Sequence, residues 1–198
     1  MLAAPGVTGQ DGDVKFEFIA DRPVLDFLPT LSARGHADVE HLNAPRDLSD
    51  WAVHAGIVDR APSVDQADLR HARNVREAMF RLVEALIEGA DPMATDRELV
   101  NAAAAAPLPT LRLDTDGVHR TGDVVGVLAV LARDCLELHD SDDRRALRWC
   151  ADEHCTRPFI DRSRGARRRW CGMRGCGDRA KAAAYRRRRR SGSEPVNG

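Results

Sequence analysis

The sequence contains no long apolar run and few aromatic residues. Aromatic side chains make up 5% of its 198 residues, with a single Tyr. No window approaches the roughly 20 apolar residues that a membrane-spanning helix needs. The first residues, Met-Leu-Ala-Ala-Pro-Gly, have neither the basic nor the apolar region of a signal peptide. We therefore expect a cytoplasmic protein that does not associate with membranes.

The sequence also lacks internal repeats and the groupings of His, Asp and Ser that a catalytic site requires. His36 and His41 lie near Asp38 and Glu40, but a solvated loop explains this cluster better than a second metal site. Hydrophobic residues make up 43% and charged residues 31% of the chain, which is a globular composition. We predict a folded protein that is not an enzyme.

The formal net charge of −1 conceals a strong asymmetry. Residues 150–190 carry thirteen arginines and one lysine against four carboxylates, a net charge of +10, whereas residues 1–149 carry a net charge of −10. A basic segment of this kind attracts polyanions, and the acidic remainder repels them. The charge pattern indicates a nucleic-acid partner for the C-terminal part of the chain.

Four of the five cysteines form the pattern Cys150-x4-Cys155-x15-Cys171-x4-Cys176. In a reducing cytosol, paired cysteines more often hold a metal than form disulfides. Four thiolates suit a structural Zn²⁺ in a tetrahedral site, and this is our prediction. An iron–sulfur cluster, four buried free thiols, and His154 replacing Cys155 as a ligand are the alternatives.

Helical periodicity dominates the N-terminal part of the chain. Thr95 and Glu98 fit a capping box that starts one helix, which Pro107 ends. Cys135 lies on an apolar helical face and is predicted to be a core residue. The expected elements are a strand at Val14–Phe18, helices at Asp47–Val58, Asp65–Glu88, Thr95–Pro107 and Val124–His139, and a hairpin joining Leu111–Leu113 to Val118–His119.

These patterns predict a mainly α N-terminal domain with a short strand or hairpin (α+β), followed by a small treble-clef-like four-cysteine zinc module with a basic C-terminal helix. Ser141–Arg145 is the predicted hinge. The expected ranges are a disordered N-terminus at 1–14, a mostly helical domain at 15–143, the zinc module at 144–190 and a disordered tail at 191–198.

Within the module, Phe159 and Trp170 are predicted to form a miniature core, and Asp161 with Ser163 an Asx turn before a basic tip. Asp178 is a good N-cap for the final helix, whose Tyr185 we expect to pack on the module. Arg168 and Arg169 are as well suited to stabilising the thiolate site as to binding a ligand. The predicted nucleic-acid contacts are Arg164, Arg167, Arg168, Arg179, Lys181, Arg186, Arg187, Arg188, Arg189 and Arg190.

Residues 148–187 resemble the CGNR zinc fingers of bacteria. The resemblance rests on the two Cys-x4-Cys pairs and on the stretches Phe159–Ser163, Arg169–Cys171 and Cys176–Lys181. Asp178 stands where that family has Asn. The change preserves helix capping, but a carboxylate repels phosphate, so it affects what the finger reads more than how it folds.

The segment Val24–Thr30 is similar to the Leu-Asp-Phe-x-Asn-Thr motif of the ABATE domain that precedes such fingers, with Pro29 in place of Asn. Leu48–Trp51 also fits that domain. The resemblance implies a stress-related bacterial transcriptional regulator with an unidentified small-molecule effector. It places a ligand pocket at Asp26, Phe27 and Thr30.

We therefore predict a DNA-binding transcriptional regulator that uses a structural four-cysteine zinc finger, with the N-terminal domain as ligand sensor or dimerisation unit. Duplex DNA, the effector and a second copy of the chain are the expected partners. An RNA-binding or ribosome-associated zinc protein is the alternative function. A zinc-dependent nuclease and a protein-interaction module have less support in the sequence.

Overall fold

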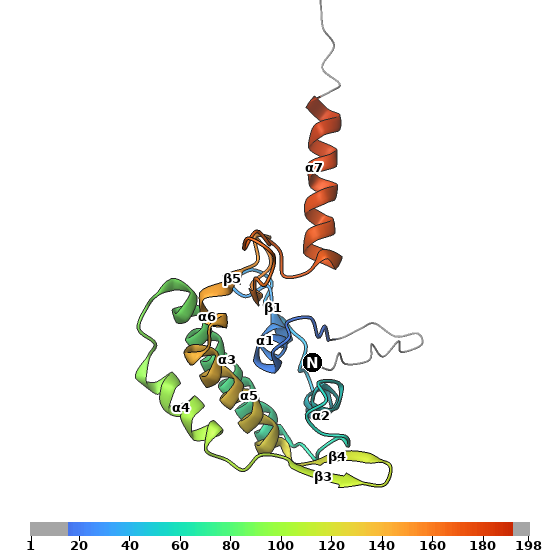
Figure 1. The fold of residues 1–198 in the computed structure, drawn as a ribbon, viewed down its shortest axis with the longest axis vertical. Coiled ribbons are helices and arrows are strands. Elements are labelled where there is room, and N and C mark those ends of the chain that lie inside the picture. The colour runs from blue at the N-terminus through green and yellow to red at the C-terminus, as the bar shows by residue number, and fades with distance from the viewer. Residues whose placement is uncertain (1–15, 192–198) are drawn as a thin grey trace, which may run out of the picture.

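A computed structural model describes residues 16–191 (Figure 1). Its N-terminal region is mostly helical and carries two short hairpins. Its elements are α1 (Pro23–Phe27), the 3-10 helix η1 (Leu28–Thr30), β1 (Leu31–Ser32), β2 (Val39–Glu40), α2 (Pro45–His54), α3 (Gln66–Glu88), α4 (Ala94–Ala104), β3 (Thr110–Asp114), β4 (Gly117–Thr121) and α5 (Val124–Asp140).

The core lies between α3, α4 and α5, with α1 packed against α5. The apolar face predicted for α3 is buried, and Asp65 caps the helix by accepting a hydrogen bond from the Asp68 amide. Gly89, at a φ of 68°, ends it in the left-handed conformation that glycine favours. Cys135 on α5 is fully buried, so its assignment to the core is confirmed.

Three local predictions were wrong. Of the predicted strand, Phe16–Phe18 have no regular structure, and Val14 and Lys15 lie outside the described residues. Helix α2 spans Pro45–His54 instead of Asp47–Val58, because Gly56 turns the chain at a φ of 68°.

The third wrong prediction is the capping box at Thr95. Helix α4 begins at Ala94, with Met93 at the N-cap and no side-chain cap. The first turn is held instead by Asp96, whose carboxylate accepts hydrogen bonds of 2.8 and 2.6 Å from Arg81 on α3. A tertiary ion pair therefore takes the place of the local cap.

The predicted hairpin is present as β3 and β4, which pair Leu113 with Val118. It extends from the edge of the helices (Figure 1). Leu111 and Leu113 are 67% and 79% exposed. The hairpin therefore contributes little to the core.

The four-cysteine segment is joined to the helices through a shared core. Strands β5 (Leu147–Trp149) and β6 (Pro158–Ile160) pair antiparallel, and Leu147 and Ile160 are buried in the same cluster as the N-terminal helices. Helix α6 (Asp143–Ala146) occupies much of the segment predicted as a hinge. The four-cysteine segment with the helix that follows it, residues 147–191, is called the finger below, and its strands pack on the helical region.

Beyond the fifth and sixth strands, a distorted π-helical turn, η2 (Met173–Gly177), leads into α7 (Asp178–Ser191). Helix α7 extends away from the rest of the molecule (Figure 1). The predicted fold class is confirmed: a mainly helical region with short hairpins, then a four-cysteine module and a C-terminal helix. The segments predicted to be disordered, 1–14 and 191–198, lie outside the described residues, except that Ser191 ends α7.

Among residues 16–191, the structure contains no helix with the length and apolarity needed to cross a membrane.

Candidate metal centre and nucleic-acid interface

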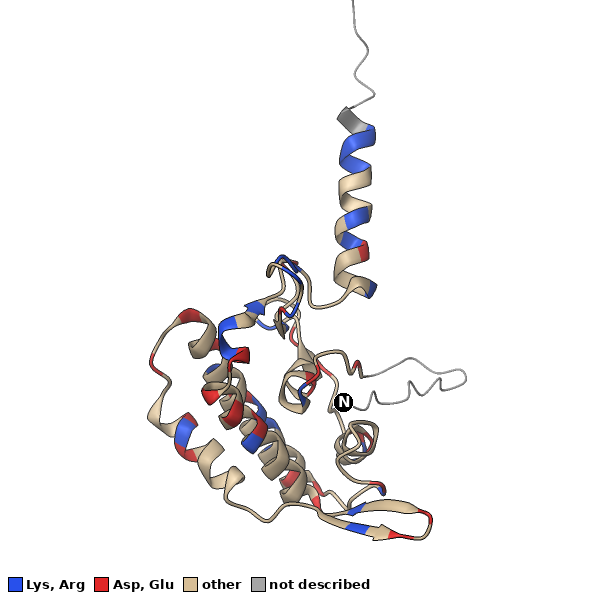
Figure 2. Ribbon diagram, in the orientation of Figure 1, with Lys and Arg blue, Asp and Glu red and all other residues tan. Residues whose placement is uncertain are grey.

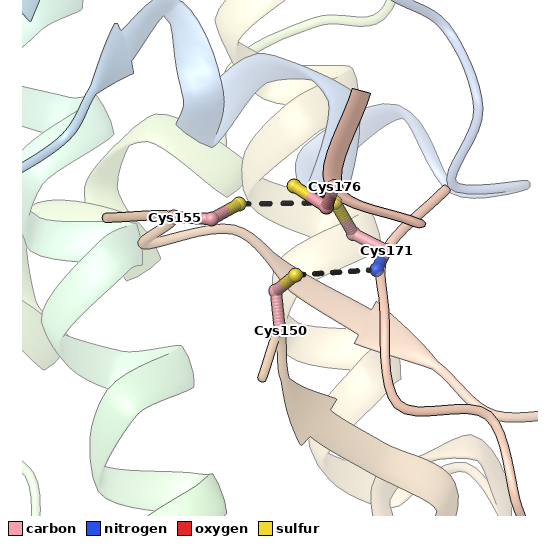
Figure 3. Close-up of side chains that lie close together, drawn as sticks. All are labelled: Cys150, Cys155, Cys171 and Cys176. Carbon is pink, nitrogen blue, oxygen red and sulfur yellow. Dashed lines mark hydrogen bonds between the residues drawn. The ribbon is translucent and has the colours of Figure 1, made fainter. Parts of the chain in front are cut away.

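The four cysteines come from two loops that the fold brings face to face. Cys150 directly follows β5, and Cys155 precedes β6, so the hairpin turn carries the first pair. Cys171 and Cys176 lie in the loop that leads into α7. Their four Sγ atoms all lie within 4.8 Å of one another (Figure 3).

The spacing of the sulfurs fits a tetrahedral metal site. Cys155 Sγ and Cys176 Sγ each lie 3.8 Å from Cys171 Sγ. A tetrahedron with metal–sulfur bonds of about 2.3 Å has edges of about 3.8 Å. A disulfide would need about 2.05 Å, so the geometry favours a shared ion over sulfur–sulfur bonds.

Donors from the protein surround the sulfurs. The Cys171 amide donates to Cys150 Sγ at 3.5 Å, and Arg179 Nη2 donates to Cys176 Sγ at 3.0 Å. A hydrogen bond with Cys171 lowers the pKa of Cys155 to about 5. Burial and the negative charge of Cys155 raise the pKa of Cys176 to about 12. The four thiols therefore do not all ionise on their own. A metal cation that binds the sulfurs would displace the protons that remain.

The loop between the pairs is organised by Asp161, which is buried. Its Oδ1 accepts hydrogen bonds from the Ser163 amide at 2.9 Å and the Ser163 hydroxyl at 2.6 Å, as predicted for an Asx turn. Its Oδ2 accepts from the Arg168 amide at 2.9 Å. The carboxylate is thus occupied in holding the basic tip.

Arg168 and Arg179, both predicted as nucleic-acid contacts, are bonded to the finger itself. Arg168 donates to the carbonyls of Trp170 and Cys171, and its guanidinium lies 4.9 Å from the centre of the Phe159 ring. Arg179 pairs with Asp152 at 2.9 Å besides contacting the Cys176 sulfur. Both arginines hold the metal loops in place.

The other predicted contacts lie on two surfaces. Arg164 and Arg167 are exposed on the tip between the cysteine pairs. Lys181, 3.7 Å from Asp178, and Arg186 to Arg189 are exposed along α7, where Figure 2 shows basic residues along the helix. The side chain of Arg190 lies outside the part of the chain that can be described.

The prediction that Tyr185 packs on the module was wrong. Tyr185 is 55% exposed, and its ring centre lies 5.9 Å from the guanidinium of Arg189. The reason is the direction of α7, which leaves the module after its first turns (Figure 1).

A groove of about 700 Å³ separates the base of α7 from the loops of the finger. One wall is formed by α7, with Ala180, Ala184 and Arg186, and the other includes Arg169 and Trp170. Arg169 was not among the predicted contacts. Its position before the Trp-Cys of the second pair was the only indication in the sequence, and that position does not distinguish an arginine that binds nucleic acid from one that stabilises the metal site.

The three residues predicted to form a ligand pocket separate in the structure. Asp26 and Thr30 line a cavity of about 270 Å³. Phe27 lies in the core with its ring centre 4.7 Å from that of Trp51. Burial raises the pKa of Asp26 to about 6, against two hydrogen bonds from backbone amides that lower it.

Two family models match the chain. Residues 21–142 match the ABATE model, whose description is "putative stress-induced transcription regulator". Residues 146–189 match the CGNR zinc finger model. A search of curated proteins finds no match.

Proposed function

The chain belongs to the ABATE family, and we propose that it is a DNA-binding transcriptional regulator in which four cysteines hold a structural Zn²⁺. In this proposal, α7 binds duplex DNA and the N-terminal region senses a small molecule.

The observation that carries the DNA proposal is the isolation of α7. A helix of 14 residues leaves the molecule with exposed arginines along its length. Helices this short are marginal without partners. Within residues 16–191, α7 packs mainly against η2, so most of its length is open to a partner such as DNA. Its diameter of about 10–12 Å with side chains matches the width of about 12 Å of the DNA major groove.

The same geometry favours DNA over RNA. The major groove of A-form RNA is too narrow and deep for side chains to read. A protruding helix is therefore better suited to duplex DNA. The groove beside α7 is lined by Arg169 and Arg186, whose guanidinium groups suit a phosphate backbone. Asp152 and Glu153 also line it, and Arg179 pairs with Asp152.

Zn²⁺ would hold the two cysteine loops together and would not take part in a reaction. Four thiolates fill a tetrahedral Zn²⁺ and leave no position for water, which is the arrangement of structural sites. The site would carry a charge of about −2, of which Arg179 offsets one unit through its contact with Cys176 Sγ. The bound ion would fix the loop from which α7 begins. This arrangement, with regulator and zinc-finger families as the matches, supports a protein that is not an enzyme.

The test is a salt titration of the affinity for duplex DNA selected from a random pool. For the zinc-loaded chain, the logarithm of the affinity should fall linearly with the logarithm of the salt concentration. Arg186→Gln should reduce this slope by about 0.9 if the Arg186 side chain touches phosphate. Arg46→Gln is the matched control, since Arg46 is 87% exposed on the N-terminal α2. An unchanged slope for Arg186→Gln would remove that side chain from the interface. Equal competition by RNA of the same sequence would contradict the DNA assignment.

A further inference from the structure

The cavity beside Asp26 is formed by both parts of the protein. Asp26, Thr30 and Ser32 come from the N-terminal region, and Arg157 comes from the finger, two residues after Cys155. Arg157 and Ser32 also line a second hollow of about 230 Å³ that borders three of the four cysteines. The cavity therefore lies against the metal loops.

Arg157 is the finger's contribution to the cavity. Its side chain is 11% exposed, and its Nη1 lies 3.2 Å from Glu17 Oε2. A guanidinium buried at a junction is costly unless carboxylates or ligand oxygens surround it. Glu17 supplies one such group, and its own side chain is 56% exposed.

Asp26 faces the same space from the other side. Its Oδ1 accepts hydrogen bonds from the amides of Ile19 at 2.9 Å and Ala20 at 3.1 Å. These amides fix the carboxylate at the cavity wall. The hydrogen bonds that the Asp26 carboxylate accepts within residues 16–191 go to Oδ1, which leaves Oδ2 available to a proton donor of a ligand.

Two hydroxyls complete the polar lining. Thr30 Oγ1 accepts from Arg76 Nη1 at 3.0 Å, so its own hydrogen can be donated. Ser32 Oγ lies 2.9 Å from His41 Nε2. In the His41 tautomer with its proton on Nε2, the imidazole donates to Ser32 Oγ, and the Ser32 hydrogen is then also available to a ligand oxygen.

Charge and size limit what fits. With Glu17 and Asp26 ionised, Arg157 positive and His41 neutral, the lining has a net charge of −1. This charge favours a cationic group and disfavours a simple anion. The cavity of about 270 Å³ corresponds to about nine waters at roughly 30 Å³ each. The ligand is therefore small.

We infer that this cavity is the effector site of the proposed regulator, and that it takes a small ammonium compound with an oxygen acceptor at its other end. The ammonium group binds Asp26, and the acceptor binds Arg157 with the hydroxyls of Thr30 and Ser32. The inference rests on the proposed sensing function and adds the ligand's chemistry and its contact with the finger.

A ligand in this position contacts both parts of the protein at once. Its contact with Arg157 restrains the loop that carries Cys155. Cys155 in turn shares the metal site with the cysteines that precede α7. Binding therefore stabilises one placement of the finger on the helical region. The affinity for DNA changes with it, because α7 is part of the finger.

The experiment uses isothermal titration of the full zinc-loaded chain with 4-aminobutyrate, butylamine and butyrate. 4-Aminobutyrate carries both groups, and each of the other two carries one. We expect 4-aminobutyrate to bind at least tenfold more tightly than either analogue. Asp26→Asn, which keeps an oxygen for the two amides, and Arg157→Gln should each weaken it at least tenfold, while Arg46→Gln should not.

Circular dichroism and zinc content show whether each variant is folded, and Asp26→Asn alone decides the matter if Arg157→Gln fails to fold. Equal binding of the three probes, no binding at 10 mM, or unaltered binding by Asp26→Asn would overturn the inference. Saturating 4-aminobutyrate should also change the DNA affinity of the wild type but not of Asp26→Asn, and no change in either would overturn the coupling. Failure of the wild type to bind DNA without any probe would count against the proposed function alone, because the calorimetry does not depend on it.

Discussion

Arg179 and Asp152 form an ion pair of 2.9 Å that ties the first turn of α7 to the loop of the first cysteine pair. Arg179 Nη2 also donates to Cys176 Sγ at 3.0 Å. One side chain therefore joins both metal loops and the helix. The direction of α7 depends on this contact, since in the described part of the chain α7 packs mainly against η2.

Arg179→Gln should weaken zinc binding by about 10–100-fold, the usual cost of removing a group that supports a metal ligand. Competition with a chromophoric chelator measures the change. Arg186→Gln is the matched control, because Arg186 is exposed on the same helix about two turns beyond Arg179. Equal zinc affinity in the two variants would show that Arg179 does not support the site.

Cys171→Ser should reduce the zinc bound by the purified protein from one equivalent to a small fraction. Cys171 Sγ lies 3.8 Å from two other sulfurs, so its loss opens the site. Metal analysis gives the readout, and Cys135→Ala is the control, since Cys135 lies in the helical core. Loss of zinc from Cys135→Ala alone would contradict the assignment of the ligands.

Asp26 should make the protein less stable as the pH rises. Its folded-state pKa of about 6 lies above the ordinary value of 3.8, so the folded state holds its proton more tightly than the unfolded state. Its contribution is most favourable below about pH 4 and is lost as the pH rises through 6. Urea unfolding should show Asp26→Asn gaining about 1.4 kcal/mol over the wild type between about pH 5 and 7.5. A pH-independent difference would contradict the raised pKa.

Leu147→Ala should lower the free energy of unfolding by about 3 kcal/mol, because Leu147 is buried between the finger and the helices. Zinc removal should also lower the melting temperature of the helical region, since the two share a core. Calorimetry with and without chelator tests both points. An N-terminal transition that ignores the chelator would show that the shared core does not couple the two parts.

Arg169→Gln should remove about one phosphate contact from the DNA complex. The slope of log affinity against log salt should then fall by about 0.9, without loss of zinc. Arg169 lines the groove opposite α7. Arg168→Gln is the informative comparison, because Arg168 is bonded to the finger's own carbonyls and should affect stability in place of the slope. The reverse pattern would exchange the roles of the two arginines.

The sequence predicted what depends on local spacing. The four ligands, the Asx turn at Asp161 and the long helix ended by Gly89 were all visible, because each is determined by residues close together in the chain. The capping box failed for the opposite reason. Asp96 is engaged by Arg81, which lies on another helix, and no local pattern reveals such a partner.

The roles of the arginines could not be separated from sequence. Arg168 and Arg169 are neighbours in one basic run, yet one is bonded inward and the other lines a groove. Arg157 was missed because it gains its role from Glu17 and Asp26, more than a hundred residues away. The exposure of Tyr185 likewise depends on where α7 points, which the loops around the four cysteines decide.

Helix α7 acts as a lever. Its 14 residues extend for about 21 Å from an attachment at one end. A rotation of about ten degrees at Asp178 would move the far end by roughly 4 Å, close to the 3.4 Å rise of one base pair. If α7 binds DNA as proposed, a change in the finger too small to disturb its metal loops would therefore shift the arginines at the end of the helix by about one step along the duplex.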